Sequence, residues 1–289
     1  MITIKNENFS IRQIRESGQC FRLELLEEAE DKEGRVYREY GLPAFGRYLR
    51  ISQCGQCIDL SCSQEEFDFI WKDYFDLDEN YGKLIASIDP GDAYLNRAAA
   101  FGSGIRILRQ DLWEMIISFI ISQQNNIKRI RHCIDLICRK YGNRMESDEG
   151  DAYYSFPTPQ ALMDAGLEDL YACNLGYRSR YVKETAGAVC RGDVDLAAIR
   201  KMKYQEAASE LKRLCGVGEK VANCICLFAL HHTDAFPVDT HINKVLKEQY
   251  PEGFPFDRYP GYGGSLQQYI FYYDLMNGKK QGVYEDGLC

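Results

Sequence analysis

Two ionisable residues, Lys220 and Asp239, lie at expected helix starts, where each could take part in covalent chemistry. Lys220 falls in the first turn of a predicted helix, where the helix dipole disfavours a cation and so makes the amine a better nucleophile. Asp239 follows Pro237 and precedes an apolar run that begins at Ile242, which predicts a helix N-cap whose carboxylate stays ionised. The two side chains together offer an amine nucleophile and a fixed negative charge.

A glycine turn separates two segments with helical spacing of apolar residues just before Lys220. Gly216 and Gly218 lack a Cβ, so the backbone can turn sharply there and bring its N–H groups close to another chain. This geometry, at the positive end of the second helix, suits a phosphate group. Each feature also has an ordinary explanation, since such turns are common, surface lysines are usually solvated and an aspartate before a helix is most often only a cap.

A run of four amides, Ser122-Gln-Gln-Asn-Asn126, joins two apolar segments with helical spacing. Asn and Gln carry both donors and acceptors, and beside Lys128 and Arg129 they could enter a duplex and bind base edges. The alternative is a polar loop that ends in a helix cap.

The segment Gly176-Tyr-Arg-Ser-Arg-Tyr181 places two arginines between two tyrosines. An aromatic ring next to a guanidinium suits the wedging of a base step and the holding of what is displaced. The start of an ordinary basic helix would have the same pattern.

Gln267 and Phe271 are four residues apart in a helix predicted after Gly263-Gly264, and Asp274 lies on the same face. Aromatic residues at this spacing usually belong to the core. An amide beside a ring could equally bind the edge and the face of a flat heterocycle.

The chain has 289 residues, a hydrophobic fraction of 45% and a net charge of −8. This balance argues against a protein that coats nucleic acid indiscriminately, because its long-range attraction to phosphates would be weak. Acidic residues concentrate in the N-terminal third, whereas basic residues cluster at 128–140, 178–183 and 200–213. Any DNA-binding face is therefore expected in the C-terminal part.

The twelve cysteines are scattered, and the first residues are polar rather than a secretory signal, which predicts a reduced, cytosolic protein. Cys54 and Cys57, with Cys62 beyond, could form a metal or redox pair, but no second pair with ligand spacing follows. No apolar run reaches the roughly 18 residues of a membrane span, so we expect no membrane association.

Alternating residues in 9–60 predict an antiparallel sheet. The expected strands lie near 20–25, 35–40, 46–51 and 57–60. A Ser63/Glu66 capping box predicts a helix to residue 74, and another is expected over 80–88. The sequence thus predicts an α+β fold, with an antiparallel-sheet domain and flanking helices at 1–90 and an all-helical region at 91–289.

Two motifs together resemble the helix-hairpin-helix (HhH-GPD) DNA glycosylases. They are L-x-G-V-G-x-K, ending at Lys220, and P-V-D-T-H around Asp239, nineteen residues later (239 minus 220). Further segments are similar to the 8-oxoguanine DNA glycosylase/lyase branch, namely 17–22, 122–126, 176–181 and the pair Gln267 and Phe271. The resemblance implies a two-lobed helical region with the hairpin at about 204–230 and an active-site cleft between the lobes.

The resemblance implies a base-excision repair enzyme that flips out and excises 8-oxoguanine from duplex DNA and then nicks the strand. Lys220 would attack C1′ of the damaged nucleotide, expelling the base and leaving a Schiff base from which the strand is cut by β-elimination. Asp239 would stabilise the positive sugar in the transition state.

Base recognition would fall to four residues in the resembling positions. The Gly18 carbonyl would accept the N7 hydrogen that 8-oxoguanine has and guanine lacks. Gln267 would bind the Watson–Crick edge, while Phe271 and Cys224 stack on opposite faces.

Phosphates would be bound by the backbone N–H groups of Gly216, Gly218 and Val221, with a further contact from His241, oriented by Asp274.

The vacated space in the duplex would be wedged by Tyr177 and filled by Gln124 and Asn125, and Arg129 and Arg178 would hold the orphaned cytosine. Much of the family has asparagine where this chain has Gln124, which makes the opposite-base preference less secure than base recognition.

Branches of the family that hold an iron–sulfur cluster carry four C-terminal cysteines, whereas here Cys289 stands alone, so no cofactor or metal is expected. The expected partner is double-stranded DNA containing 8-oxoguanine, bound by a monomer at the nucleoid or, in a eukaryote, in the nucleus. Two alternatives stay open: a monofunctional alkylpurine DNA glycosylase, which would not need Lys220, and a non-catalytic helix-hairpin-helix DNA-binding protein, in which Lys220 and Asp239 would be dispensable.

Overall fold

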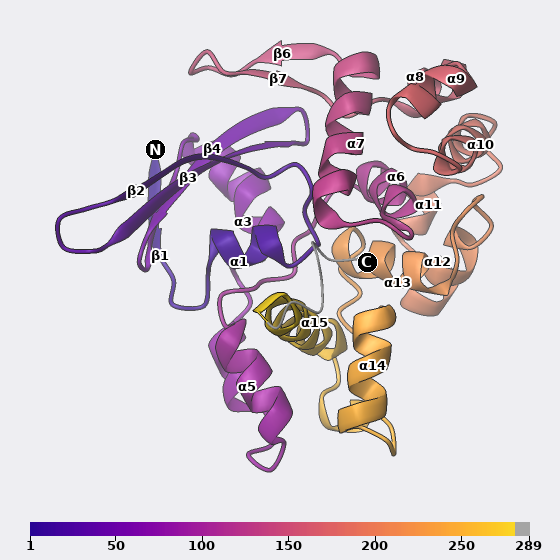
Figure 1. Cartoon of the computed structure of the whole chain (residues 1–289). Coiled ribbons are helices and arrows are strands. Elements are labelled where there is room, and N and C mark those ends of the chain that lie inside the picture. Colours follow the sequence, from indigo (N-terminus) through magenta and orange to yellow (C-terminus); the bar gives the residue numbers. More distant parts are fainter. Residues whose placement is uncertain (281–289) are drawn as a thin grey trace.

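A five-stranded antiparallel sheet dominates the N-terminal region, with strand order β1-β5-β4-β3-β2 (Figure 1). The computed structural model describes residues 1–280, and residues 281–289, with Cys289, lie outside the described part. The strands are β1 Ile2–Lys5, β2 Glu24–Glu30, β3 Val36–Ala44, β4 Arg47–Cys54 and β5 Cys57–Leu60. The predicted sheet is confirmed, although its first expected strand begins at Glu24 rather than near Cys20, and β1 was not predicted.

Period-two alternation along β4 and β5 directs Leu49, Ile51 and Ile58 into a core beneath the sheet, where each is 0% exposed. Helix α1 (Ile11–Glu16) packs into the same core and was not predicted, because six residues with two buried apolar side chains give too little periodicity. The chain then forms a broken helix in place of the continuous one expected. Its parts are α2 Gln64–Glu66, a π-helical turn Phe67–Trp71 and α3 Lys72–Tyr74, opened by the predicted capping box at Ser63.

The rest of the described chain is mostly helical, which confirms the α+β class. Its α-helices are α4 Tyr81–Ala86, α5 Ala93–Phe101, α6 Leu112–Ser122, α7 Ile127–Tyr141, α8 Pro159–Asp164, α9 Leu167–Ala172, α10 Arg178–Cys190, α11 Leu196–Ile199, α12 Tyr204–Leu211, α13 Glu219–Phe228, α14 Thr240–Gln249 and α15 Gly263–Lys280. A small hairpin of β6 (Arg144–Glu146) and β7 (Ala152–Tyr154) interrupts them. It was not predicted, because strands of three residues are too short to show alternation.

Two further cores hold the helices. One unites α6, α7, α10, α12 and α13, and the other unites α4, α5, α14 and α15. Lys220 and Asp239 therefore lie at the starts of helices that belong to different cores. Because α4 precedes residue 90 yet shares a core with α15, the division of the chain near that residue stays a prediction.

Candidate active site and DNA-binding surface

The turn between α12 and α13 has the backbone that its glycines predicted. Gly216 has φ +80°, and a Cβ there would come within 2.6 Å of the Tyr181 ring, so only glycine fits. Gly218 is the N-cap of α13, and a Cβ there would meet nothing within 4 Å. Among the described residues, no side chain caps the N-terminus of α13, and Val221 lies in the first turn of this helix. The turn therefore offers open N–H groups at a helix N-terminus, where an anion is stabilised.

Lys220 lies in the first turn of α13, as predicted. Its Nζ is 5.8 Å from the centroid of the Phe119 ring on α6, within reach of a cation–π interaction. Phe119 is 2% exposed and stacks on Phe228 with centroids 5.5 Å apart. This contact was not predicted, because the two residues come from helices far apart in the chain.

Asp239 is the N-cap of α14, which confirms its predicted structural role. Its Oδ1 accepts a hydrogen bond of 2.8 Å from the backbone N–H of Ile242. A carboxylate held in this way has a fixed orientation.

His241, in the first turn of α14, lies 2.8 Å through Nδ1 from Oδ2 of Asp274 on α15, as predicted. Lys244 contacts the other carboxylate oxygen at 3.3 Å. Burial raises the pKa of Asp274, but the contacts with His241 and Lys244 outweigh it and hold that pKa below its ordinary value. His241 is only 2% exposed, and its described contacts join α14 to α15. The phosphate contact expected of it stays a prediction.

The structure brings together Gly18 and Phe271, 253 residues apart (271 minus 18). Gly18 follows α1 with φ +73°, and a Cβ there would lie 3.4 Å from the Phe271 ring. Phe271 is 5% exposed and meets the ring of His241 edge-on at 5.5 Å. Cys224 is 3% exposed on α13, one turn beyond Lys220. The Gly18–Phe271 contact agrees with a shared recognition site, and the roles of Gly18, Phe271 and Cys224 stay predictions.

Gln267 is 3% exposed, and its amide is already hydrogen-bonded to two protein groups. Its Nε2 donates to the Pro237 carbonyl at 3.0 Å, and its Oε1 accepts from Nε2 of Gln268 at 3.0 Å. Gln268 was missed from the sequence, although two consecutive amides in an apolar helix are a signal. Its own Oε1 is buried with no hydrogen-bond partner among the described residues.

The two amides predicted to fill the duplex differ in exposure. Gln124 is exposed with φ +47°, whereas Asn125 is 2% exposed and donates to the Ile121 carbonyl at 3.1 Å. The next residue, Asn126, caps α7 by accepting from the N–H of Arg129 at 2.9 Å, so the polar-loop interpretation holds for it. Arg129, five residues after Gln124, is also exposed.

Gln123, also missed, connects three segments that were expected to contact DNA. Its side-chain Nε2 donates to the Gly216 carbonyl at 2.9 Å, and its own carbonyl accepts from Nε of Arg178 at 2.7 Å. Arg178 is 4% exposed, its guanidinium lies 4.5 Å from the ring of Tyr177, and it also donates to the Gln124 carbonyl. A buried charge needs such partners. Through these contacts Arg178 holds the loop in place. Tyr177, by contrast, is 43% exposed and faces outward.

Cys54 and Cys57 are unbonded cross-strand neighbours at the β4–β5 turn. Within residues 1–280, no three His, Cys, Asp or Glu side chains converge as a metal site requires. None of the helices described in that range combines the length and the apolar composition needed to cross a membrane.

Two protein families match the chain in succession. Residues 1–116 match the 8-oxoguanine DNA glycosylase N-terminal domain, and residues 117–252 match the HhH-GPD superfamily of base excision DNA repair proteins. The N-glycosylase/DNA lyase of Saccharomyces cerevisiae is 35% identical over 215 residues, or 70% of this chain and 55% of the yeast protein. The N-glycosylase/DNA lyase OGG1 of Arabidopsis thaliana is 32% identical over 193 residues, or 65% and 53% of the two chains. The chain thus spans about half the length of these curated relatives.

A solved structure of the Clostridium acetobutylicum 8-oxoguanine glycosylase/lyase, in complex with double-stranded DNA containing cytosine opposite 8-oxoguanine, is similar throughout. It has a TM-score of 0.83 and 33% identity, with 96% of this chain and 99% of that chain covered. MBOgg1 in complex with a low-affinity DNA ligand has a TM-score of 0.84 and 33% identity, with 96% of each chain covered. An Archaeoglobus fulgidus 3-methyladenine DNA glycosylase shares the fold, with a TM-score of 0.70 at 20% identity over 96% of this chain and 99% of that chain. The predicted resemblance is confirmed, and the chain belongs to the HhH-GPD superfamily of base excision DNA repair proteins, in the branch that carries the 8-oxoguanine DNA glycosylase N-terminal domain.

Proposed function

We propose that this protein is a bifunctional 8-oxoguanine DNA glycosylase and AP lyase of base excision repair. The observations that carry the proposal are the positions of Lys220 and Asp239 at the starts of α13 and α14, and the Gly18–Phe271 contact. The names of the yeast, plant and clostridial relatives support both the base and the lyase step.

In the proposed reaction, the neutral Lys220 amine attacks C1′ of the damaged nucleotide. The glycosidic bond breaks, its electron pair leaves with the base, and the base gains a proton. Asp239, fixed by its bond to Ile242, stabilises the positive charge that develops on the sugar. The C1′–O4′ bond then opens, its electron pair stays on O4′, which gains a proton, and the protonated imine of Lys220 forms. Removal of a C2′ proton from this imine expels the 3′ phosphate by β-elimination, which nicks the strand.

Base recognition requires an exchange of partners. The Gly18 carbonyl would accept the N7 hydrogen of 8-oxoguanine, and Phe271 and Cys224 would stack on the two faces of the base. Gln267 would release its bond to Gln268 or Pro237 when it binds the Watson–Crick edge. Each exchange costs little if the new hydrogen bond replaces the old one.

DNA would lie across the hairpin, with phosphates at the N–H groups of Gly216, Gly218 and Val221. His241, which joins α14 to α15, would support the same backbone.

The exposed Tyr177 would wedge the duplex, and we assign the plug to Gln124 rather than to Asn125, which is buried. Arg129 would hold the orphaned base, since Arg178 is engaged with loop carbonyls. Cytosine, the partner base in the clostridial complex, is the proposed partner base here. We further propose that the enzyme acts as a monomer at the chromosome, in the nucleoid or the nucleus according to the organism.

Borohydride trapping tests the proposal. A duplex with one 8-oxoguanine should give a covalent adduct, and Lys220→Gln should abolish it while leaving duplex binding intact. Lys212→Gln is the matched control, because Lys212 is a second lysine of the hairpin, paired with Glu219 at 2.8 Å. A second duplex with one alkylated purine tests the monofunctional alternative, which release of that base without an adduct would indicate. Binding of both duplexes without base release would indicate a non-catalytic protein.

A further inference from the structure

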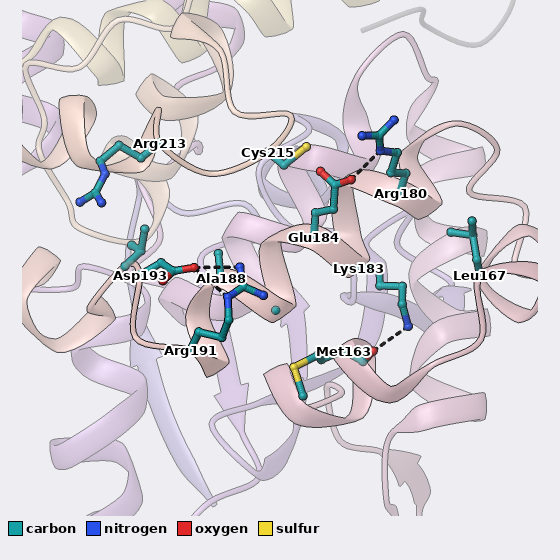
Figure 2. A pocket seen from close by; sticks show the side chains of 12 residues that line it. Met163, Leu167, Arg180, Lys183, Glu184, Ala188, Arg191, Asp193, Arg213 and Cys215 are labelled. Carbon is teal, nitrogen blue, oxygen red and sulfur yellow. Dashed lines mark hydrogen bonds and ion pairs between the residues drawn. The ribbon is translucent and has the colours of Figure 1, made fainter.

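A cavity of about 730 Å3 lies among α8, α9 and α10, and neither Lys220 nor Asp239 lines it. This volume lies within the range of small-molecule binding sites. Figure 2 shows its side chains arranged around the opening, with Arg180, Glu184 and Cys215 at one edge and Met163 at the other. The uncharged lining residues are Met163, Leu167, Gly187, Ala188, Val194 and Cys215.

The charged lining residues carry more positive than negative charge. They are four cations and two carboxylates, namely Arg180, Lys183, Arg191, Arg213, Glu184 and Asp193. Arg180 pairs with Glu184 at 2.5 Å and Arg191 pairs with Asp193 at 2.8 Å, while Arg213 pairs with a carboxylate outside the lining, Glu210. In a chain with a net charge of −8, this concentration of cations is local.

Lys183 differs from the three arginines. Its Nζ donates to the carbonyl oxygens of Met163 and Ala165 at 2.7 and 2.5 Å, and no carboxylate in the described range pairs with it. Carbonyl oxygens satisfy two of its three donors but do not neutralise its charge. The cavity therefore has an ammonium group with a donor to spare beside an apolar wall formed by Met163 and Leu167.

The cavity also contacts the residue before the glycine turn. The Cys215 carbonyl accepts a hydrogen bond of 3.0 Å from Oγ1 of Thr185 on α10. Burial, and then the neighbouring Glu184 carboxylate, raise the pKa of the Cys215 thiol to about 11. Thr185 thus holds the chain where it enters Gly216, and Glu184 lies beside the same cysteine.

We propose that this cavity binds a small amphipathic anion, with its charged group at Lys183 and its apolar body against Met163, Leu167 and Val194. We also propose that occupancy alters duplex binding through Cys215. This second part rests on the proposed function, whereas the binding site does not.

Fluorescence titration with anilinonaphthalene sulfonate, an aromatic anion, tests the site in the full chain. Lys183→Gln keeps a donor for the carbonyls but removes the charge, and should weaken probe binding about tenfold, as expected for a hydrogen bond to a charged group. Ala188→Phe fills the cavity and should weaken binding at least as much. Lys140→Gln, a control at a lysine of α7 that pairs with Asp169 on α9, should leave binding unchanged.

Competition identifies the anion. Displacement of the probe by adenosine monophosphate would indicate a phosphate-bearing ligand, and displacement by benzoate would indicate a carboxylic acid. Probe binding that Lys183→Gln or Ala188→Phe leaves unchanged would overturn the site, as would failure of both competitors.

Duplex binding in saturating probe tests the coupling. An allosteric coupling of about fivefold or more is expected in the wild type and none in Ala188→Phe. An unchanged duplex affinity would overturn the coupling but leave the site. A protein that binds the probe but no duplex would instead overturn the proposed function.

Discussion

The hairpin and the base-recognition residues differ in where their hydrogen bonds go. At the hairpin, the start of α13 has no side-chain cap from the described part of the chain, and Gly218 faces open space. The N-terminus of α13 is therefore open to a ligand. At the recognition residues, Gln267 is bonded to Pro237 and Gln268, and Phe271 is 5% exposed. In the proposed function, the phosphate site is therefore preformed, whereas base binding must displace contacts within the protein.

The largest expected effect separates chemistry from binding at Asp239, the N-cap of α14. Asp239→Asn should lower turnover on the order of 100- to 1,000-fold, as removal of a transition-state electrostatic partner does. Asparagine also caps helices, so α14 and duplex binding should persist. Single-turnover kinetics and fluorescence anisotropy measure the two quantities. Asp195→Asn, at the N-cap of α11, is the control, and equal activity of both variants would contradict the role of Asp239.

Gly216→Ala should disrupt the preformed side. The left-handed backbone alone costs about 1–2 kcal/mol for a residue with a Cβ, and the new atom would also clash with the Tyr181 ring at 2.6 Å. Gly192→Ala is the matched control, because Gly192 has φ +76° but its Cβ would meet nothing within 4 Å. We expect both substitutions to lower the free energy of unfolding. Gly216→Ala should lower it more and should also weaken duplex binding. Equal denaturation midpoints would refute the clash.

A smaller loss is expected at the connection between the loop and the hairpin. Gln123→Ala removes the bond to the Gly216 carbonyl but keeps the main-chain bond to Arg178. Since one hydrogen bond contributes about 1 kcal/mol net, duplex affinity should fall roughly fivefold, with the single-turnover rate at saturating enzyme unchanged. Gln160→Ala, at an exposed amide bonded to Asp164, is the control. Unchanged duplex affinity would show that Gln123 does not position the hairpin.

The same comparison explains which parts the sequence could predict. The cap at Asp239 and the turn at Gly216 depend on neighbours within a few residues, and both predictions are confirmed. The fold class also follows from local periodicity. By contrast, the burial of Arg178 and the bonds of Gln123 depend on packing between distant segments, which no local pattern encodes. For Gly18 and Phe271, only the family resemblance suggested a shared site.

The His241–Asp274 contact predicts a pH dependence on the recognition side. Because the folded-state pKa of Asp274 lies below its ordinary value of 3.8, its carboxylate stabilises the fold above about pH 4. That stabilisation is lost as the pH falls through the folded pKa. Asp274→Asn should therefore be less stable than the wild type at neutral pH, with the difference shrinking at pH 3. Thermal unfolding at both values measures it, and a constant difference would exclude the linkage.

The smallest effect is expected at Gln268, and it tests whether the Gln267 amide is held in one orientation. Gln268→Leu keeps the volume and removes a buried Oε1 that has no partner among residues 1–280, so stability should change by less than about 1 kcal/mol. It also removes the donor that fixes Oε1 of Gln267, leaving that amide free to rotate. The preference for 8-oxoguanine over guanine should then fall a few-fold, with duplex affinity retained. Competition between a duplex with 8-oxoguanine and one with guanine measures this preference. An unchanged preference would mean that Pro237 alone orients Gln267.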